Sequence, residues 1–226
     1  MLRRILLIIV VGALSGPIFA SEVVEKAIRS ETAEEAVSLA TAEVLAFISA
    51  GKSYADDDPE KFYRDAEFLL RPMIDFTRFA RNVMGPYYKA ATPQQRENFA
   101  ESFKWSLVRT YALALVEFGD GEVAVLPPRR PPRNPNKVNV LQEITYQGRT
   151  YAVAYKMQRS SEQVWRIQNM VVEGVNVGIN YKTQFASAMK DPQYGGDMDA
   201  VIAAWSDVLE PSDAADVSTT SETAPT

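Results

Sequence analysis

The sequence predicts an α+β fold in which helices precede and follow a small antiparallel sheet. Up to residue 118, apolar residues recur every three or four positions, which is typical of amphipathic helices. After a proline cluster at 127–135, the apolar period changes to two. A helical period returns after Gly174. We therefore expect about four strands packed against a bundle of N-terminal and C-terminal helices.

Three helices are predicted before residue 85. Thr32 and Glu35 form a capping box that begins the first helix, which ends near Gly51. Asp58-Pro59 supplies an N-cap and a first-turn proline for a second helix through Leu70. A short third helix covers 75–84, and Gly85-Pro86 ends it.

The longest predicted helix begins at a second capping box, Thr92 to Gln95, and reaches about Phe118. Its apolar positions are Phe99, Phe103, Leu107, Tyr111 and Leu115, widened by Trp105, Val108 and Ala112. Because so much of its circumference is apolar, we expect this helix to be covered on more than one side.

The strands are predicted at 137–146, 149–158 and 165–172, with a further short strand at 122–126. Turns are expected at Gln147-Gly148 and at 160–163. The strand through Val172 ends at Gly174 and passes directly into a helix over 175–189, and a last helix covers 199–209. The result is an antiparallel meander.

The two ends of the chain have a different character from the domain between them. Residues 1–20 have the charge and apolar pattern of a cleavable signal peptide, with Arg3 and Arg4 before an apolar segment at 5–14. We expect an exported, periplasmic protein with one domain at 21–210. The tail at 211–226 lacks large apolar residues, which predicts disorder.

The composition excludes several kinds of chemistry. The chain of 226 residues has no histidine and no cysteine, so imidazole bases, thiol nucleophiles, disulfides and Cys-ligated zinc are ruled out. Its net charge of −5 argues against nucleic-acid binding. The acidic run 56–58 lacks the spacing of a calcium site, so we expect no metal site. Three arginines of the proline cluster could bind anionic headgroups or an acidic partner, or could simply be solvated. They are Arg129, Arg130 and Arg133.

One set of apolar residues is open to two interpretations. Strand alternation places Tyr151, Val153, Tyr155 and Met157 on one face. Such residues form either a filled core or the wall of a ligand cavity, and periodicity does not distinguish the two. Catalysis would require a carboxylate that points into this set, and the alternation provides none there.

Two blocks of sequence resemble the MlaC-type proteins, the periplasmic phospholipid-binding proteins of the toluene-tolerance family. The first block is 87–96 followed by Phe99, Phe103, Leu107 and Tyr111. The second is 165–175 followed by Asn180-Tyr181 and Gln184-Phe185. The resemblance covers about residues 30–210. The chain departs from the family pattern at Asn169, where an aspartate is usual, and at Asn176, where a serine is frequent.

The resemblance implies a highly curved, NTF2-like sheet with an apolar cavity that takes phospholipid acyl chains. It implies a carrier without catalytic residues or cofactor, and two docking partners. These are an outer-membrane lipoprotein with its porin, and an inner-membrane ABC transporter with an MCE-domain subunit. By shuttling phospholipid between these complexes, the carrier would maintain the lipid asymmetry of the outer membrane.

We expect the lipid-binding slot to have a sheet side, a helix side and a rim. The sheet side comprises Tyr151, Val153, Tyr155 and Met157, with Ile167, Met170 and Val172 from the neighbouring strand, whose inward face the sequence leaves ambiguous. The helix side comprises Phe76, Phe79, Val83, Phe103, Leu107 and Tyr111, and the rim Val175, Val177 and Ile179. The protein is expected to be a monomer.

Two other functions would require different features of the chain. A docking module without enclosed lipid would need a filled core and an exposed apolar patch. A small NTF2-like enzyme would need a buried carboxylate with a raised pKa. An empty apolar volume of several hundred cubic ångströms would favour the carrier.

Overall fold

The computed structural model describes residues 17–118 and 121–207. The helices are α1 (Pro17–Ala27), α2 (Ala33–Gly51), α3 (Pro59–Leu70), α4 (Phe76–Met84), α5 (Pro93–Phe118), α6 (Val177–Ala188) and α7 (Met198–Asp207). Two short 3₁₀ segments, η1 (Gly85–Lys89) and η2 (Pro192–Tyr194), join them. Most of the predicted signal peptide and the whole predicted tail lie outside the described residues. Within these, no helix has both the length and the apolar character needed to cross a bilayer.

The predicted helix starts are confirmed by their caps. Thr32 Oγ1 accepts a hydrogen bond from the backbone N–H of Glu35 at 3.1 Å, and Asp58 Oδ1 accepts one from Lys61 at 2.9 Å. At α5 the capping box is complete, because Thr92 N–H also donates to Gln95 Oε1 at 2.9 Å. These side chains satisfy N–H groups that have no partner inside their helix.

Five antiparallel strands form one sheet in the order β1-β2-β3-β4-β5. They are β1 (Glu122–Leu126), β2 (Lys137–Tyr146), β3 (Arg149–Arg159), β4 (Trp165–Val172) and β5 (Val175–Asn176). The β2–β3 turn is the predicted Gln147-Gly148, where both residues have positive φ, 50° and 77°. That geometry suits the right-handed twist of the two strands.

The chain after β4 differs from the prediction. Glu173 and Gly174 both have positive φ and turn the chain back, so Val175 and Asn176 pair with β4 as a fifth strand. The helix expected from Val175 therefore begins at Val177. The last helix begins at Met198 rather than at residue 199.

Two further differences have a packing cause. Helix α1 was not expected, yet its Val24 and Ala27 are buried against other apolar residues. Gly51 does not end α2 by a left-handed conformation. It is buried, and a Cβ there would lie 2.4 Å from the ring of Phe62, so the glycine is required for close approach of α3.

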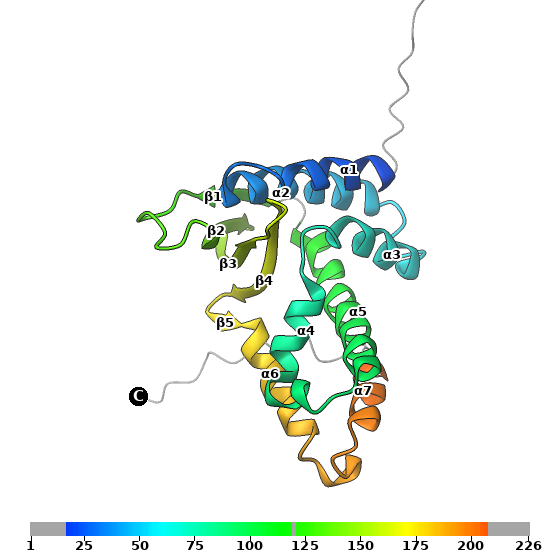
Figure 1. Cartoon of the computed structure of the whole chain (residues 1–226). Helices are drawn as coiled ribbons and strands as arrows, with labels where there is room; N and C mark the ends of the chain where they lie inside the picture. The colour runs from blue at the N-terminus through cyan, green and yellow to red at the C-terminus, as the bar shows by residue number, and fades with distance from the viewer. Residues whose placement is uncertain (1–16, 119–120, 208–226) are drawn as a thin grey trace, which may run out of the picture.

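Figure 1 shows how these elements are arranged. Helices α1 and α2 lie along one end of the sheet, and α4, α5, α6 and α7 form a bundle that extends away from it. The described core accordingly has two parts. The helical cluster is centred on Phe62, Phe79, Phe99, Phe103 and Phe185. The sheet cluster joins α1 and α2 to the strands and includes Val24, Val37, Val140, Met157, Trp165 and Ile167.

Candidate functional site

The inner face of the sheet is the candidate site, and strand register defines it. Val140 pairs with Tyr155, Gln142 with Val153, and Ile144 with Tyr151. Paired residues project to the same side of an antiparallel sheet. The predicted set on β3 therefore shares one face with the alternate residues of β2, and α2 contacts that face through Gln142.

A bulge in β4 resolves the ambiguity left by the sequence. Tyr155 pairs with Met170, but Met157 pairs with Ile167, so β4 uses three residues where β3 uses two. The extra residue, Gln168, reverses the alternation. Ile167, Met170 and Val172 thus lie on the same inner face. In a regular strand Ile167 and Met170, three positions apart, would lie on opposite faces.

The predicted lining residues are divided between the two clusters. Those on α4 and α5 belong to the helical cluster, with Tyr111, Met170 and Val172 packed against it. Met157 and Ile167 belong to the sheet cluster, and Tyr155 packs against it. Val153 is only 6% exposed but belongs to neither cluster, and half-buried Tyr151 also lies outside both.

The three predicted rim residues have different environments. Val175 and Ile179 are 47% and 62% exposed, as a rim requires. Val177 is instead buried in the helical cluster. It is the first residue of α6, and its side chain points into the bundle rather than to an opening.

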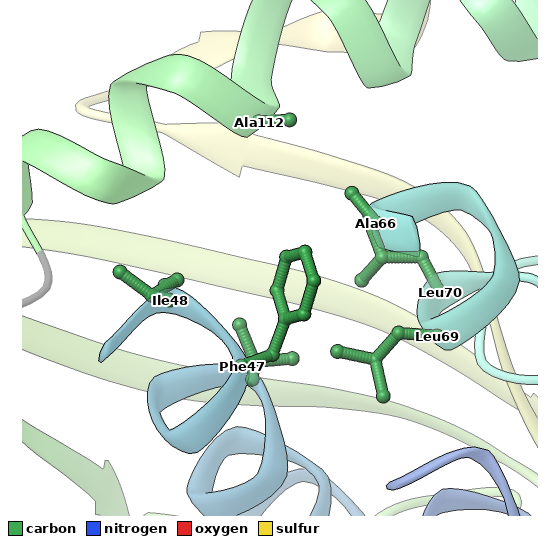
Figure 2. Close-up of a pocket in the computed structure, with 7 residues that line it drawn as sticks. Phe47, Ile48, Ala66, Leu69, Leu70 and Ala112 are labelled. Carbon is green, nitrogen blue, oxygen red and sulfur yellow. The ribbon is translucent and has the colours of Figure 1, made fainter. Parts of the chain in front are cut away.

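An apolar void lies where α2, α3 and α5 meet (Figure 2). Phe47 and Ile48 border it from α2, Leu69 and Leu70 from α3, and Ala112 from α5. Its volume is about 10 Å³, close to the room needed by one water molecule. This is far below the several hundred cubic ångströms that we named as favouring a carrier. None of these residues is among the predicted slot residues; Ala112 is predicted only as part of the apolar circumference of the long helix.

One polar network interrupts the apolar inner face. Gln142 is buried; its Nε2 donates to Thr41 Oγ1 on α2 at 2.8 Å, and its Oε1 accepts from the Tyr155 hydroxyl at 2.8 Å. Burial raises the pKa of Tyr155 to about 12. The network fixes α2 on the sheet and keeps each buried polar group paired.

Two tyrosine side chains form a pair between α5 and α6. The Tyr111 and Tyr181 hydroxyls interact, and burial is the main cause of the raised pKa of both. Hydrogen bonds with Thr110, Ser106 and Tyr111 partly offset the rise in the Tyr181 pKa. The inner region is therefore apolar with neutral hydroxyl groups.

The start of α6 is held to β4 by two asparagines. Asn176 Oδ1 accepts from the Ile179 N–H at 3.0 Å and from Asn169 Nδ2 at 2.9 Å. Asn169 Oδ1 accepts from the Gly178 N–H at 2.9 Å. A Cβ at Gly178 would lie 2.6 Å from Asn169 Oδ1, so the close contact depends on glycine. The two residues that depart from the family pattern thus form a helix cap.

A larger groove, of about 570 Å³, opens on the outside of α3, α4 and α5. Its lining includes Glu67, Arg71, Glu101, Lys104 and Arg166. Lys104 Nζ lies 3.3 Å from Glu67 Oε1 and 2.8 Å from Glu101 Oε1. These ion pairs line one part of the groove. Its other lining residues include Ile74, the predicted Phe76, Tyr88, Pro93 and Ala100, so the groove is mixed in character.

The described residues place few carboxylates near the inner face. On β1–β5, no carboxylate lies on the inner face, and the buried Glu67 is on α3, paired with Lys104. Within residues 17–118 and 121–207, no group of three or more carboxylates could hold a metal ion.

Comparison with known proteins gives consistent matches. Residues 39–207 match the sequence model of the family described as MlaC protein. The toluene tolerance protein ttg2D of Pseudomonas putida is 30% identical over 177 residues, which are 77% of this chain and 80% of that protein. The intermembrane phospholipid transport system binding protein MlaC of Haemophilus influenzae is 22% identical over 138 residues, 60% and 64% of the two chains.

A solved structure is also similar. It is the phospholipid-binding protein from Ralstonia solanacearum in complex with a phospholipid. The TM-score is 0.70 and the identity 26%, over 79% of this chain and 98% of that one.

Proposed function

This chain belongs to the MlaC family, and from that premise we propose that it is a periplasmic phospholipid carrier. A signal peptide at 1–20 would direct its export, and residues 21–210 would act as one domain. The carrier would move lipids between an outer-membrane lipoprotein–porin complex and an inner-membrane ABC transporter with an MCE-domain subunit. It would act as a monomer, without a cofactor and without catalysis.

The need for a carrier follows from the hydrophobic effect. A phospholipid has on the order of 30 acyl CH₂ groups, each worth about 0.8 kcal/mol when transferred out of water. Exposure of both chains therefore costs roughly 20 kcal/mol, which prevents free diffusion between membranes. A carrier must cover the chains and leave the phosphate solvated, because an unpaired buried charge is costly.

The observation that carries this proposal is the divided inner face. Apolar side chains from β3 and β4 face the helices, yet the buried Val153 is in neither of the two core clusters that the described residues form. A surface of this kind can exchange protein contacts for acyl-chain contacts without disrupting either cluster. The predicted lining residues, together with Phe47 and Leu70, are the proposed contacts.

The small void indicates how a lipid would enter. About 10 Å³ between α2, α3 and α5 cannot hold an acyl chain. For an acyl chain to occupy this position, α2 and α3 would have to separate from α5. The separating surfaces are apolar, so the acyl chains would replace contacts of the same kind, which limits the cost of opening.

Mass spectrometry of lipids extracted from the protein tests the proposal. The mature protein is purified from periplasm without detergent, and we expect about one phospholipid per chain. A matched pair of variants locates the site. Val153→Glu should fold but lose the lipid, whereas Val140→Glu, on the same face but inside the sheet cluster, should unfold. If Val153→Glu also unfolds, Val153 belongs to an ordinary core and the proposed lining is wrong.

Two exposed large apolar residues favour a second candidate, a docking module without enclosed lipid. The exposed Val175 and Ile179 would then belong to a protein interface. A folded wild-type protein that contains no lipid would favour this function over the carrier.

A further inference from the structure

The β1–β2 loop is the most basic exposed segment of this acidic chain. Its ten residues, 127–136, contain five prolines and the three arginines Arg129, Arg130 and Arg133. All ten residues are exposed, and the loop projects from the sheet in Figure 1. Among the described residues, none makes an ion pair or hydrogen bond with these three guanidinium groups. Three unpaired positive charges are thus presented together.

The loop is fixed at its base and stiffened along its length. Asn134 Oδ1 accepts from the Asn136 N–H at 2.9 Å, and the Asn136 carbonyl accepts from the Arg159 N–H at 2.9 Å. Prolines restrict the backbone between the arginines. The arginines are therefore held away from the sheet at a lower entropic cost than in a flexible loop.

The outer face of the sheet also carries basic residues at the end beside the loop. Register places Lys137, Lys156 and Arg166 on the outer face at the end nearest the loop. Glu122 and Glu143 lie on the same face toward the opposite end of the strands. Glu162, in the β3–β4 turn, is the acidic residue near the basic end. The outer face is therefore positive beside the loop and negative away from it.

An apolar row crosses the middle of this face. Leu126 pairs with Leu141, Leu141 with Ala154, and Ala154 with Val171. All four side chains are half-buried, and none belongs to either described cluster. A basic edge beside an apolar row is the arrangement by which peripheral proteins bind a membrane surface.

We propose that the β1–β2 loop and the adjoining basic end of the outer face bind an anionic phospholipid bilayer. This deepens the proposed function and rests on it, because a phospholipid carrier has to approach a lipid surface while its own net charge is −5. The guanidinium groups match phosphate geometry, and their clustering orients the molecule against the general repulsion. All three arginines are exposed, and they line neither the void nor the groove described above, which favours a laterally disordered layer of phosphates over one shaped protein partner.

Vesicle flotation with matched variants tests this inference. The vesicles contain phosphatidylglycerol with phosphatidylcholine, or phosphatidylcholine alone. The loop variant is Arg129→Gln/Arg130→Gln/Arg133→Gln. The control variant is Arg64→Gln/Arg78→Gln/Lys190→Gln, which removes three exposed charges from the helical side. Both variants have the same net charge, so only the position of the lost charges differs.

We expect the wild-type protein and the control to bind the anionic vesicles, less strongly at high salt, and not to bind neutral ones. The loop variant should bind about a hundredfold more weakly, since each basic residue near an anionic surface contributes about fivefold. If the wild type does not bind anionic vesicles, the proposal is overturned and an acidic protein becomes the partner of these charges. Equal losses in both variants would also overturn it.

Lipid content separates this inference from the proposed function. All three proteins are extracted and measured by mass spectrometry. If the wild type carries lipid but does not bind vesicles, the bilayer inference fails and the carrier stands. If the wild type carries no lipid, the carrier fails, while flotation still measures surface binding.

Discussion

Asn169→Asp should destabilise this protein although it restores the residue usual in the family. Asn169 donates to Asn176 Oδ1 at 2.9 Å and accepts from the Gly178 N–H. An aspartate has no donor, so two acceptor oxygens would face each other at that distance. If the Asn176 amide turned to donate instead, the Ile179 N–H would lose its capping acceptor.

The expected magnitude follows from these contacts. The lost hydrogen bond and the opposed oxygens cost about 1.5–2.5 kcal/mol. A carboxylate at the start of α6 recovers about 0.3–1 kcal/mol through the helix dipole. The net loss is therefore about 0.5–2 kcal/mol. Asn176→Ser in the same chain should remove this loss, because a serine hydroxyl donates to the aspartate and accepts from the Ile179 N–H.

Equilibrium urea unfolding of the wild type, both single variants and the double variant measures this coupling. We expect a coupling free energy of about 0.5–2 kcal/mol. Asn180→Asp is the control, since this exposed residue in the first turn of α6 adds the same charge outside the network. The reasoning is refuted if Asn169→Asp is as stable as the wild type, or if the two substitutions are additive.

Three further predictions concern the interior. Phe47→Ala should destabilise by about 3 kcal/mol, because Phe47 packs against both clusters and stacks on Phe62 at 5.0 Å; a change below about 1 kcal/mol in urea unfolding would contradict this. Tyr155→Phe should cost about 1 kcal/mol by leaving Gln142 Oε1 without its donor, whereas exposed Tyr-to-Phe changes should be neutral in the same assay. Burial raises the folded-state pKa of Tyr155 to about 12, above its unfolded value of about 10, so its contribution to stability is complete below about pH 10 and is lost as pH rises toward 12. Urea unfolding between these pH values should therefore show a fall that is smaller in Tyr155→Phe, and identical curves would disprove the assignment.

The proposed transport function suggests a role for the hydrogen bonds of the asparagine cap and the Gln142 network. If a lipid entered between α2, α3 and α5, parts of the core would have to separate while the remainder stayed folded. The asparagine cap at α6 and the Gln142 network at α2 hold the two sides of the inner face to the sheet. They are the contacts that would keep the slot aligned while it opens.

The sequence by itself determined most of the helices and strands, because their signals are local. The caps at Thr32, Asp58 and Thr92 each act within three residues of the helix start. Strand alternation likewise predicted one apolar face on β3, and the register shows that alternate residues of β2 share it.

Only the tertiary structure decided how that face is used. The bulge at Gln168 depends on pairing between two strands, so alternation within β4 alone could not place Ile167 and Met170 on one face. The requirement for glycine at Gly51 comes from Phe62 on another helix. The division of the apolar residues into two clusters depends on where α1, α2 and the helical bundle lie. Apolar periodicity records that a residue is buried, but the partner that buries it is set by contacts between distant segments.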